Sequence, residues 1–263
     1  MRSAAAVLLV LAFLPGCATA PAVGGRSSQA QARPKTLQDA AAAGDLALVR
    51  TFLAKGMAAD AKGPGDATAL HRAAETGQVL VMDDLLLAGA SLDSRDVNGA
   101  APLHYAAWGG KAGAVHRLLA RGAQADSRTK NGHTPLMWAA AGGHTAAMEA
   151  LMARGADPSA RNDEGGTALH SAAANGKAAA IDLLASRGAD LDSLDKSGGT
   201  PLFNAGIQNK PEAVAALLKA GAKPGGNNGL VGLEVKESSG TIEVVKASPG
   251  RPAEKAGIKS GDL

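Results

Sequence analysis

The amino-acid sequence predicts an all-α repeat solenoid of stacked helix-turn-helix units, followed by a short segment rich in β-branched residues. The main observation is a self-repeat with a period of 33 residues that covers most of the chain. Apolar residues also recur within each copy at helical spacing, and threonine, proline and glycine recur where helices should begin and end. A period this regular is typical of small identical units that stack on their neighbours, rather than of a single globular core.

The period is clearest in a four-residue block near the start of each copy. Its five clear copies are Thr68-Ala-Leu-His71, Ala101-Pro-Leu-His104, Thr134-Pro-Leu-Met137, Thr167-Ala-Leu-His170 and Thr200-Pro-Leu-Phe203. A degenerate copy precedes them, with Lys35 at the threonine position. The predicted repeats therefore span 35–67, 68–100, 101–133, 134–166, 167–199 and 200–228.

Three apolar columns run through the copies and predict two short helices per repeat, because residues three or four apart share one helix face. The first column is Leu37, Leu70, Leu103, Leu136, Leu169 and Leu202. The second is Val49, Met82, Val115, Met148, Ile181 and Val214, and the third is Phe52, Leu85, Leu118, Leu151, Leu184 and Leu217. Neither helix is long enough to be stable alone, so stacking must stabilise both.

The residues between these columns predict where each helix begins and ends. A threonine cap before the first helix is expected at Thr68, Thr134, Thr167 and Thr200. Proline is expected at the first helical position at Pro102, Pro135 and Pro201, where its missing N–H costs nothing. Glycines that follow the first helix are Gly44, Gly77, Gly110, Gly143 and Gly176, and glycine favours the left-handed conformation that ends many helices.

These residues resemble the ankyrin repeat, whose pattern is Thr-Pro-Leu-His-x-Ala-Ala, then Gly, then Leu-Leu-x-x-Gly-Ala. The resemblance covers about residues 35–228, and it implies that a hairpin finger follows the second helix of each repeat. The fingers are expected to centre on Asp96, Lys130, Asp163 and Lys196. The resemblance also implies a protein–protein interaction module, in which the first helices and the fingers line a concave face.

The positions that differ between repeats predict where a protein partner binds. The chain has three Phe, two Trp and one Tyr, and three of these six aromatic residues fall on first-helix positions of the predicted concave face. The predicted partner-binding residues are Arg72, Glu75, Tyr105, Trp108 and Trp138. Trp, Tyr and Arg dominate the energetics of protein interfaces. The alternative interpretation is that the aromatic side chains pack against a finger and only stabilise the fold.

The N-terminus predicts export. A positive start precedes the apolar run 4–14, which is too short for a permanent membrane span and suits a signal peptide over residues 1–17. Its end, Leu14-Pro-Gly-Cys17, resembles the lipobox of bacterial lipoproteins and implies lipidation of Cys17, the only cysteine. Residues 18–34 then form a flexible tether with a reach of roughly 20–25 Å. Because Ala18 replaces the aspartate of inner-membrane retention, the resemblance implies an outer-membrane lipoprotein facing the periplasm.

A second interpretation of the N-terminus is ordinary signal cleavage after Ala20, which gives a soluble periplasmic or secreted protein. This alternative leaves Pro21 at the new terminus, a residue that such peptidases handle poorly.

The C-terminal segment 229–263 breaks the period and predicts strands over 229–235 and 241–245, which are rich in β-branched residues. The segment is similar to the first half of a PDZ domain of bacterial envelope proteases. In a complete domain of that kind, Val231, Gly232 and Leu233 would form the loop that binds a peptide carboxylate. The match stops at Leu263, which suggests that the chain is incomplete. The alternative function is therefore the targeting or regulatory half of a PDZ-containing envelope protease whose catalytic part lies beyond residue 263.

Charge and motifs argue against several other classes of protein. The excess of positive charge lies in Arg2, Arg26, Arg33 and Lys35, which give +4, whereas residues 36–228 have a net charge of −1, so the repeats have no continuous basic stripe for nucleic acid. No motif of a hydrolase, a metalloprotease or a phosphate-binding loop is present, and the sequence predicts neither an enzyme nor a cofactor.

The histidines are predicted to be structural. His71, His104 and His170 recur 33 residues apart and so are expected one repeat apart, too distant to share a metal ion and suited to hydrogen bonds between repeats. His116 and His133 are expected at the surface. A third functional interpretation is a structural spacer without a specific ligand.

Overall fold

The computed structural model describes residues 36–223, 233–238 and 241–247, and over the first of these ranges it forms twelve α-helices in six pairs. They are α1 (Leu37–Ala43), α2 (Leu46–Ala54), α3 (Ala69–Thr76), α4 (Val79–Leu87), α5 (Pro102–Trp108), α6 (Ala112–Ala120), α7 (Pro135–Gly142), α8 (Thr145–Met152), α9 (Ala168–Ala174), α10 (Ala178–Ser186), α11 (Pro201–Ile207) and α12 (Pro211–Lys219). The predicted helical repeat solenoid is thus confirmed.

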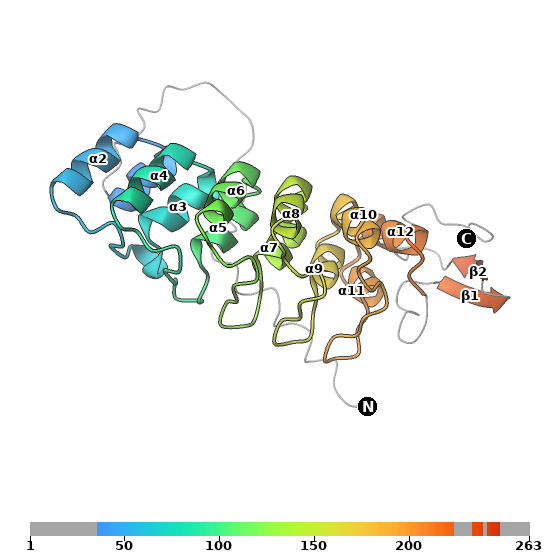
Figure 1. Ribbon diagram of the computed structural model, residues 1–263. Helices are drawn as coiled ribbons and strands as arrows, with labels where there is room; N and C mark the ends of the chain where they lie inside the picture. The colour runs from blue at the N-terminus through green and yellow to red at the C-terminus, as the bar shows by residue number, and fades with distance from the viewer. Residues whose placement is uncertain (1–35, 224–232, 239–240, 248–263) are drawn as a thin grey trace, which may run out of the picture. The chain divides into compact units, whose positions relative to one another are not determined.

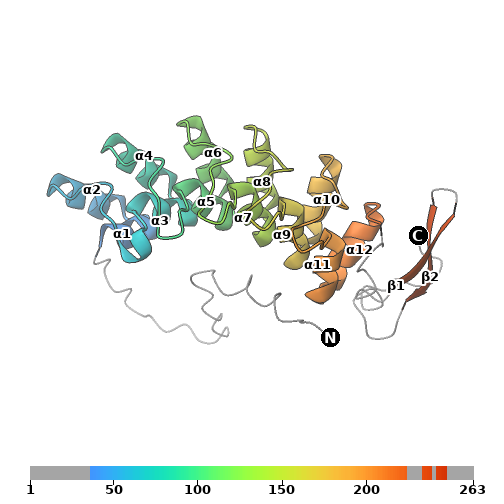
Figure 2. The same cartoon turned by 90° about the horizontal axis from the view of Figure 1, so that it is seen from below.

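The helices form two layers. The first helix of each pair packs against the first helix of the next pair, from α1 to α11, and the second helices do the same from α2 to α12 (Figures 1 and 2). The first and second predicted columns are buried in every repeat, and so is the third except at Phe52, which is only partly buried at the start of the stack. Each repeat therefore buries its apolar face only by contact with its neighbours.

The helix ends follow the predicted residues. Thr68, Thr134, Thr167 and Thr200 are all N-caps, and α5, α7 and α11 begin at the three predicted prolines. Gly110 has a φ of 65°, and the other four predicted glycines lie in the same left-handed region. The first repeat begins one residue later than its register predicts, because Thr36 caps α1 through the Asp39 amide.

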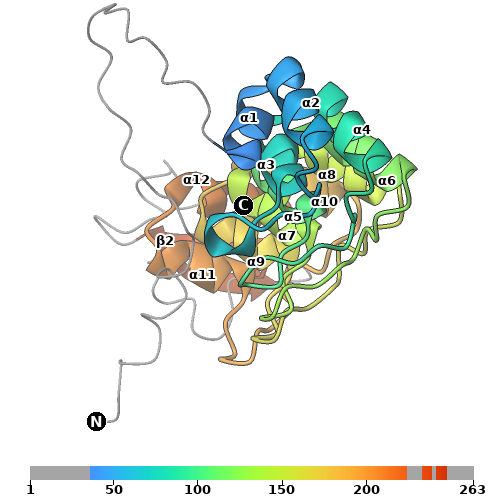
Figure 3. The same ribbon diagram turned by 90° about the vertical axis from the view of Figure 1, so that its left-hand side faces the viewer.

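A finger loop follows each of the first five helix pairs, and each loop has a tight tip at 63–67, 96–100, 129–133, 162–166 or 195–199. Figure 3 looks along the stack and shows these loops projecting on one side of the helices. Neighbouring tips are joined by backbone hydrogen bonds, such as the one that the Lys130 amide donates to the Asn98 carbonyl at 2.9 Å. The fingers therefore form a continuous edge.

Three arginines reinforce this edge, one in each of the central fingers. The Arg128 Nη1 donates to the carbonyl of Gly132 in its own finger at 3.3 Å and to the carbonyl of Arg161 in the next at 2.8 Å. Arg95 and Arg161 make the same pair of contacts one repeat earlier and one repeat later. A guanidinium suits this role because its planar fork of donors can reach two acceptors at once.

The predicted centre of the second finger is wrong by one residue. Asp96 lies at the buried start of that finger, and Val97 is the residue in register with Lys130, Asp163 and Lys196. The period itself should have shown this, because Lys130 follows Val97 by 33 residues.

Beyond the repeats, β1 (Leu233–Ser238) and β2 (Thr241–Ala247) form an antiparallel pair with an irregularity between Glu234 and Val235. Both overlap the predicted strands. A PDZ-like fold over 229–263 stays a prediction, since most of that pattern lies outside the described residues. The same is true of the signal peptide, the tether and Cys17. Among the described residues, none of the helices is both long and apolar enough to cross a membrane.

Candidate protein-interaction surface

The five predicted binding residues lie on three consecutive helices of the first layer. Arg72 and Glu75 are on α3, Tyr105 and Trp108 on α5, and Trp138 on α7. Because α3 packs on α5 and α5 on α7, the five side chains meet on one surface, here called the first-helix face.

The aromatic rings of this face contact one another, and Trp138 is at their centre. Its ring centroid lies 6.2 Å from that of Tyr105 and 6.3 Å from that of Trp108, the second pair in an edge-to-face arrangement. Such geometry is favourable beyond the burial of apolar area. The structure thus places all three aromatic residues in one cluster.

A surface hollow of about 400 Å³ lies beside this cluster, between the ends of α3 and α5. It is lined by Arg72, Glu75, Thr76, Trp108, Gly109 and Lys111. Arg72 and Glu75 form an ion pair of 2.6 Å along one wall. The hollow therefore combines an indole, an ion pair and a further cation.

Gly109 allows α3 and α5 to approach closely at this hollow. Its backbone is right-handed, but a Cβ at this position would collide with the Glu75 carbonyl oxygen. The sequence analysis missed this residue, because only the left-handed Gly110 next to it follows the repeat pattern.

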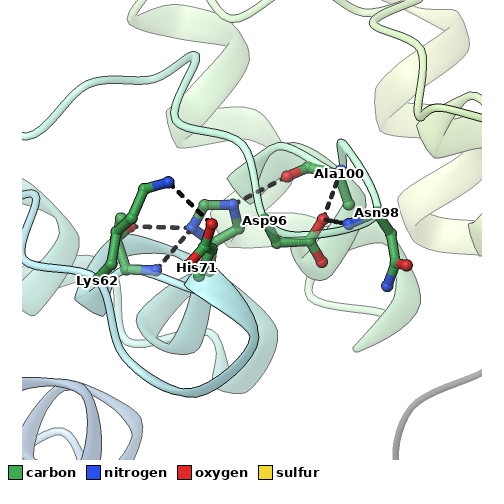
Figure 4. A network of polar contacts seen from close by, with 7 residues as sticks. Lys62, His71, Asp96, Asn98 and Ala100 are labelled. Atoms are coloured by element: carbon green, nitrogen blue, oxygen red, sulfur yellow. Dashed lines mark hydrogen bonds and ion pairs between the residues drawn. The ribbon is translucent and has the colours of Figure 1, made fainter.

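Tyr105 is hydrogen-bonded to the finger of the preceding repeat. Its hydroxyl donates to the Asp96 Oδ2 at 2.9 Å, and its ring stands edge-on to His71 with centroids 5.0 Å apart. Burial, together with the negative charge of Asp96, raises the pKa of the Tyr105 phenol above its ordinary value of 10.0. Asp96 also accepts from the amides of Asn98 and Ala100, both at 2.8 Å (Figure 4). Tyr105 thus has the finger-packing role that the sequence analysis gave as the alternative.

Trp138 also has a structural role, whereas Trp108 faces the hollow. Trp138 packs against the buried core and stands edge-on to His104, with ring centroids 5.3 Å apart. Trp108 is half-buried, contacts Trp138 and lines the hollow with Arg72 and Glu75. Of the three aromatic residues, Trp108 is therefore the one best placed to contact a partner.

The three repeat histidines are structural, as predicted, but the prediction that their hydrogen bonds run between repeats is wrong, because each ring bonds to the last residue of its own repeat. The Thr68 amide donates to His71 Nδ1 at 3.1 Å, so the ring proton is on Nε2, which donates to the Ala100 carbonyl at 3.0 Å (Figure 4). His104 and His170 make the same two contacts. Burial lowers the pKa of all three, and that of His104 falls to about 4. The described residues contain no group of His, Cys, Asp or Glu side chains arranged to hold a metal ion.

His116 is exposed as predicted, but the surface prediction for His133 is wrong. His133 is half-buried, and its Nε2 lies 3.1 Å from the Asn162 Nδ2 in the next finger. Burial lowers its pKa. Its position at the end of one finger, against the next, could be known only once the fingers were placed.

The predicted carboxylate loop is mostly outside the described residues. Val231 and Gly232 fall outside them, and Leu233 begins β1.

Comparison with known proteins agrees with this architecture. The family model described as "Ankyrin repeats (3 copies)" matches four overlapping stretches, residues 37–129, 81–162, 103–195 and 147–228. The ankyrin repeat domain of human ASB11, solved by crystallography, is similar with a TM-score of 0.67 and 28% sequence identity. This match covers 84% of the present chain and 95% of the ASB11 chain. A search of curated protein sequences gave no significant match.

Proposed function

The chain belongs to the ankyrin repeat family, and from this premise we propose that it is a scaffold that binds a protein partner through the first-helix face and the fingers. The observation that carries the proposal is the position of Trp108. It adjoins Trp138, lines the hollow and stands beside the Arg72–Glu75 ion pair. An indole next to a hollow, with charged groups at its rim, is the usual composition of an interface hot spot.

The stack also supports this proposal through its rigidity. Repeats joined by ring contacts of the histidines, by finger hydrogen bonds and by arginines present a surface that is already ordered before binding. Binding then costs little conformational entropy in the scaffold. We propose no catalytic step for this surface.

The test is capture of the partner by crosslinking in cells, with wild type compared with Trp108→Ala. Truncating a tryptophan hot spot often costs about 2 kcal/mol or more, so a defined partner should be lost from the variant. Tyr105 and Trp138 are unsuitable for this first test, because both also stabilise the fold.

The matched control is Leu87→Ala, since Leu87 is the most exposed large apolar residue of the described chain and lies on α4 in the second layer. The control should retain the partner. Equal recovery of the partner with Trp108→Ala and with wild type would contradict the proposal.

An alternative function is targeting or regulation of an envelope protease, with a PDZ-like segment that captures a peptide C-terminus at Val231, Gly232 and Leu233. The β-hairpin formed by β1 and β2 supports a β-rich character for this segment. A pair of peptides that differ only in a free or an amidated C-terminus tests the idea with the full chain. Preference for the free carboxylate would support it, and equal binding of both would contradict it.

We also propose that the protein is exported and lipidated at Cys17, on the basis of its N-terminal sequence. Labelled palmitate should enter the wild-type protein and not Cys17→Ala, and wild type should fractionate with the outer membrane. A mature protein that begins at Pro21 would favour simple secretion over lipidation. An uncleaved protein would contradict export by either route.

A further inference from the structure

We propose that a row of basic side chains along one edge of the stack binds an extended acidic segment of the protein partner. The row lies at the turns between the first and second helices. This inference rests on the proposed function and adds the chemistry of the segment that the partner must supply.

The row is formed by the residue that precedes the second helix in repeats two to six, whereas the first repeat has Asp45 at this position. From the second repeat to the sixth, these N-cap residues are Gln78, Lys111, His144, Lys177 and Lys210. Three of the last four are therefore lysines, with a histidine between them.

Each side chain of the row lies over the turn glycine of the preceding repeat. A Cβ on Gly77 would be 3.1 Å from the Lys111 Cδ, a Cβ on Gly143 would be 3.0 Å from the Lys177 Cδ, and the same holds for Lys210 over Gly176. The methylene stems thus rest on backbone, and Lys111 is exposed while Lys177 and Lys210 are partly exposed. A lysine held by its stem loses less side-chain entropy on binding than a free one.

Among the described residues, the lysines of the row have no ionic partner. The ion pairs of that part of the chain involve Arg50, Lys62, Arg72, Arg117 and Arg121, and none includes Lys111, Lys177 or Lys210. Three acidic residues adjoin the row in the sequence, and the first is Asp45, which caps α2 through the Leu48 amide. Glu75 pairs with Arg72, and Glu212 is exposed in the first turn of α12. The row therefore carries an excess of positive charge.

The first-helix positions next to the row are neutral in the last three repeats, so they do not offset its positive charge. The first-helix positions in register with Glu75 and Trp108 are Ala141, Ala174 and Ile207 in the last three repeats. No carboxylate at these positions competes for the cations.

The spacing of the row suits an extended polypeptide. Stacked helices lie roughly 8–10 Å apart, and an extended chain in the polyproline II conformation advances about 3.1 Å per residue and brings every third side chain to the same side. A carboxylate at every third residue of the segment would therefore lie opposite the basic side chain of each successive repeat. A segment of about ten residues would reach from Lys111 to Lys210. Because Lys111 also lines the hollow with Trp108, one end of that segment would lie beside the aromatic cluster.

A peptide fits this row better than a nucleic acid does. Duplex DNA presents a charge about every 1.7 Å along its axis, much denser than one cation per repeat. The row also lacks arginine, whose fork matches phosphate oxygens in two-point contacts.

The experiment measures binding of a fluorescent twelve-residue peptide with glutamate at every third position to the full chain. The reference peptide has glutamine at the same positions, and a ten-nucleotide oligothymidylate is the polyanion control. Three triple variants are compared with wild type. They are Lys111→Gln with Lys177→Gln and Lys210→Gln, the same three positions changed to Arg, and Lys55→Gln with Lys196→Gln and Lys219→Gln as an equal change of charge at exposed sites elsewhere.

We expect the glutamate peptide to bind at least tenfold more tightly than the glutamine peptide. The row-to-Gln variant should lose about tenfold in affinity, while the Arg variant and the control variant stay within about threefold of wild type. An equal loss in the control variant, unchanged binding by the row-to-Gln variant, or tighter binding of the oligonucleotide would overturn the proposal. If one of these results occurs while partner capture still depends on Trp108, the row fails and the proposed function stands.

Discussion

The His104 Nε2 lies 3.0 Å from the carbonyl oxygen of His133, which is 29 residues further along the chain and at the end of the finger of the same repeat. The Nδ1 of the same ring accepts from the Ala101 amide at 3.1 Å. One neutral imidazole thus caps its own helix and joins it to the end of the finger of the same repeat. His71 and His170 repeat this arrangement on either side.

Replacement of His104 by methionine should lower the free energy of unfolding by about 1–3 kcal/mol. Methionine is the residue that the fourth repeat has at this position, as buried Met137, so the size is tolerated. The loss comes mainly from the buried Ala101 amide, which would have no partner, and from the His133 carbonyl, which would keep only the Thr129 amide. Denaturant unfolding measures the change. His116→Met, on the exposed side of α6, is the control and should change the free energy by less than about 0.5 kcal/mol.

The stability of the protein should decrease as the pH falls from about 6.5 to 4. In the unfolded chain a histidine has a pKa of about 6.5, whereas burial lowers the pKa of folded His104 to about 4. Between these values the unfolded state binds the extra proton, so acid favours unfolding by up to about 3 kcal/mol from His104 alone. His71 and His170 shift in the same direction.

Denaturant midpoints measured from pH 7 to pH 4 test this dependence. In His104→Met the decrease should be smaller than in wild type by the contribution of this one residue. Identical slopes in the two proteins would show that His104 is not the group that titrates.

Tyr105 should remain protonated in the folded protein above pH 10. It is the only tyrosine in the chain, so absorbance at 295 nm reports its ionisation alone. Burial raises its pKa, and the carboxylate of Asp96 raises it further. The stability that this shift provides is complete below the unfolded pKa of about 10, and it is lost as the pH rises toward the folded value.

The titration should therefore coincide with alkaline unfolding in wild type. Tyr105→Phe should lower the free energy of unfolding at pH 7 by about 1–3 kcal/mol, since it removes a hydrogen bond to a carboxylate. Ionisation near pH 10 in the folded state would contradict the finger contact.

Gly109→Ala should destabilise the stack by about 1–3 kcal/mol, because the new methyl group would force α3 and α5 apart at the Glu75 carbonyl. Gly113 in the same repeat provides the matched control. A Cβ there has only a Val79 methyl 4.0 Å away, so Gly113→Ala should be neutral or stabilising by up to about 1 kcal/mol. Thermal unfolding of the two variants distinguishes these outcomes, and equal effects would contradict the close approach.

Much of the architecture could be predicted from the sequence because the repeat specifies local structure several times over. The threonine caps, the prolines and two of the three apolar columns agree with the structure in every copy where they were predicted. The predictions that failed concern residues of the finger loops. The burial of His133 depends on how one finger packs against the next, whereas the register of Asp96 already follows from the 33-residue period.

The candidate site, too, could be predicted only in part from the sequence. The pattern of variable positions selected five residues, and the structure places them on one face. The sequence pattern could not reveal that Asp96 accepts a hydrogen bond from the Tyr105 hydroxyl. These two residues belong to a loop and a helix, and no periodicity describes how the two pack. Gly109 was missed for a related reason, since its role depends on the backbone of the preceding repeat.

The sequence by itself determined the unit, because caps, helix faces and turn glycines act between residues a few positions apart. The tertiary structure decided which side chains remain available for a partner. Tyr105 and Trp138 differ from Trp108 only in the contacts that neighbouring repeats and fingers make with them. Those contacts join residues of different repeats, and they exist only when the repeats are stacked.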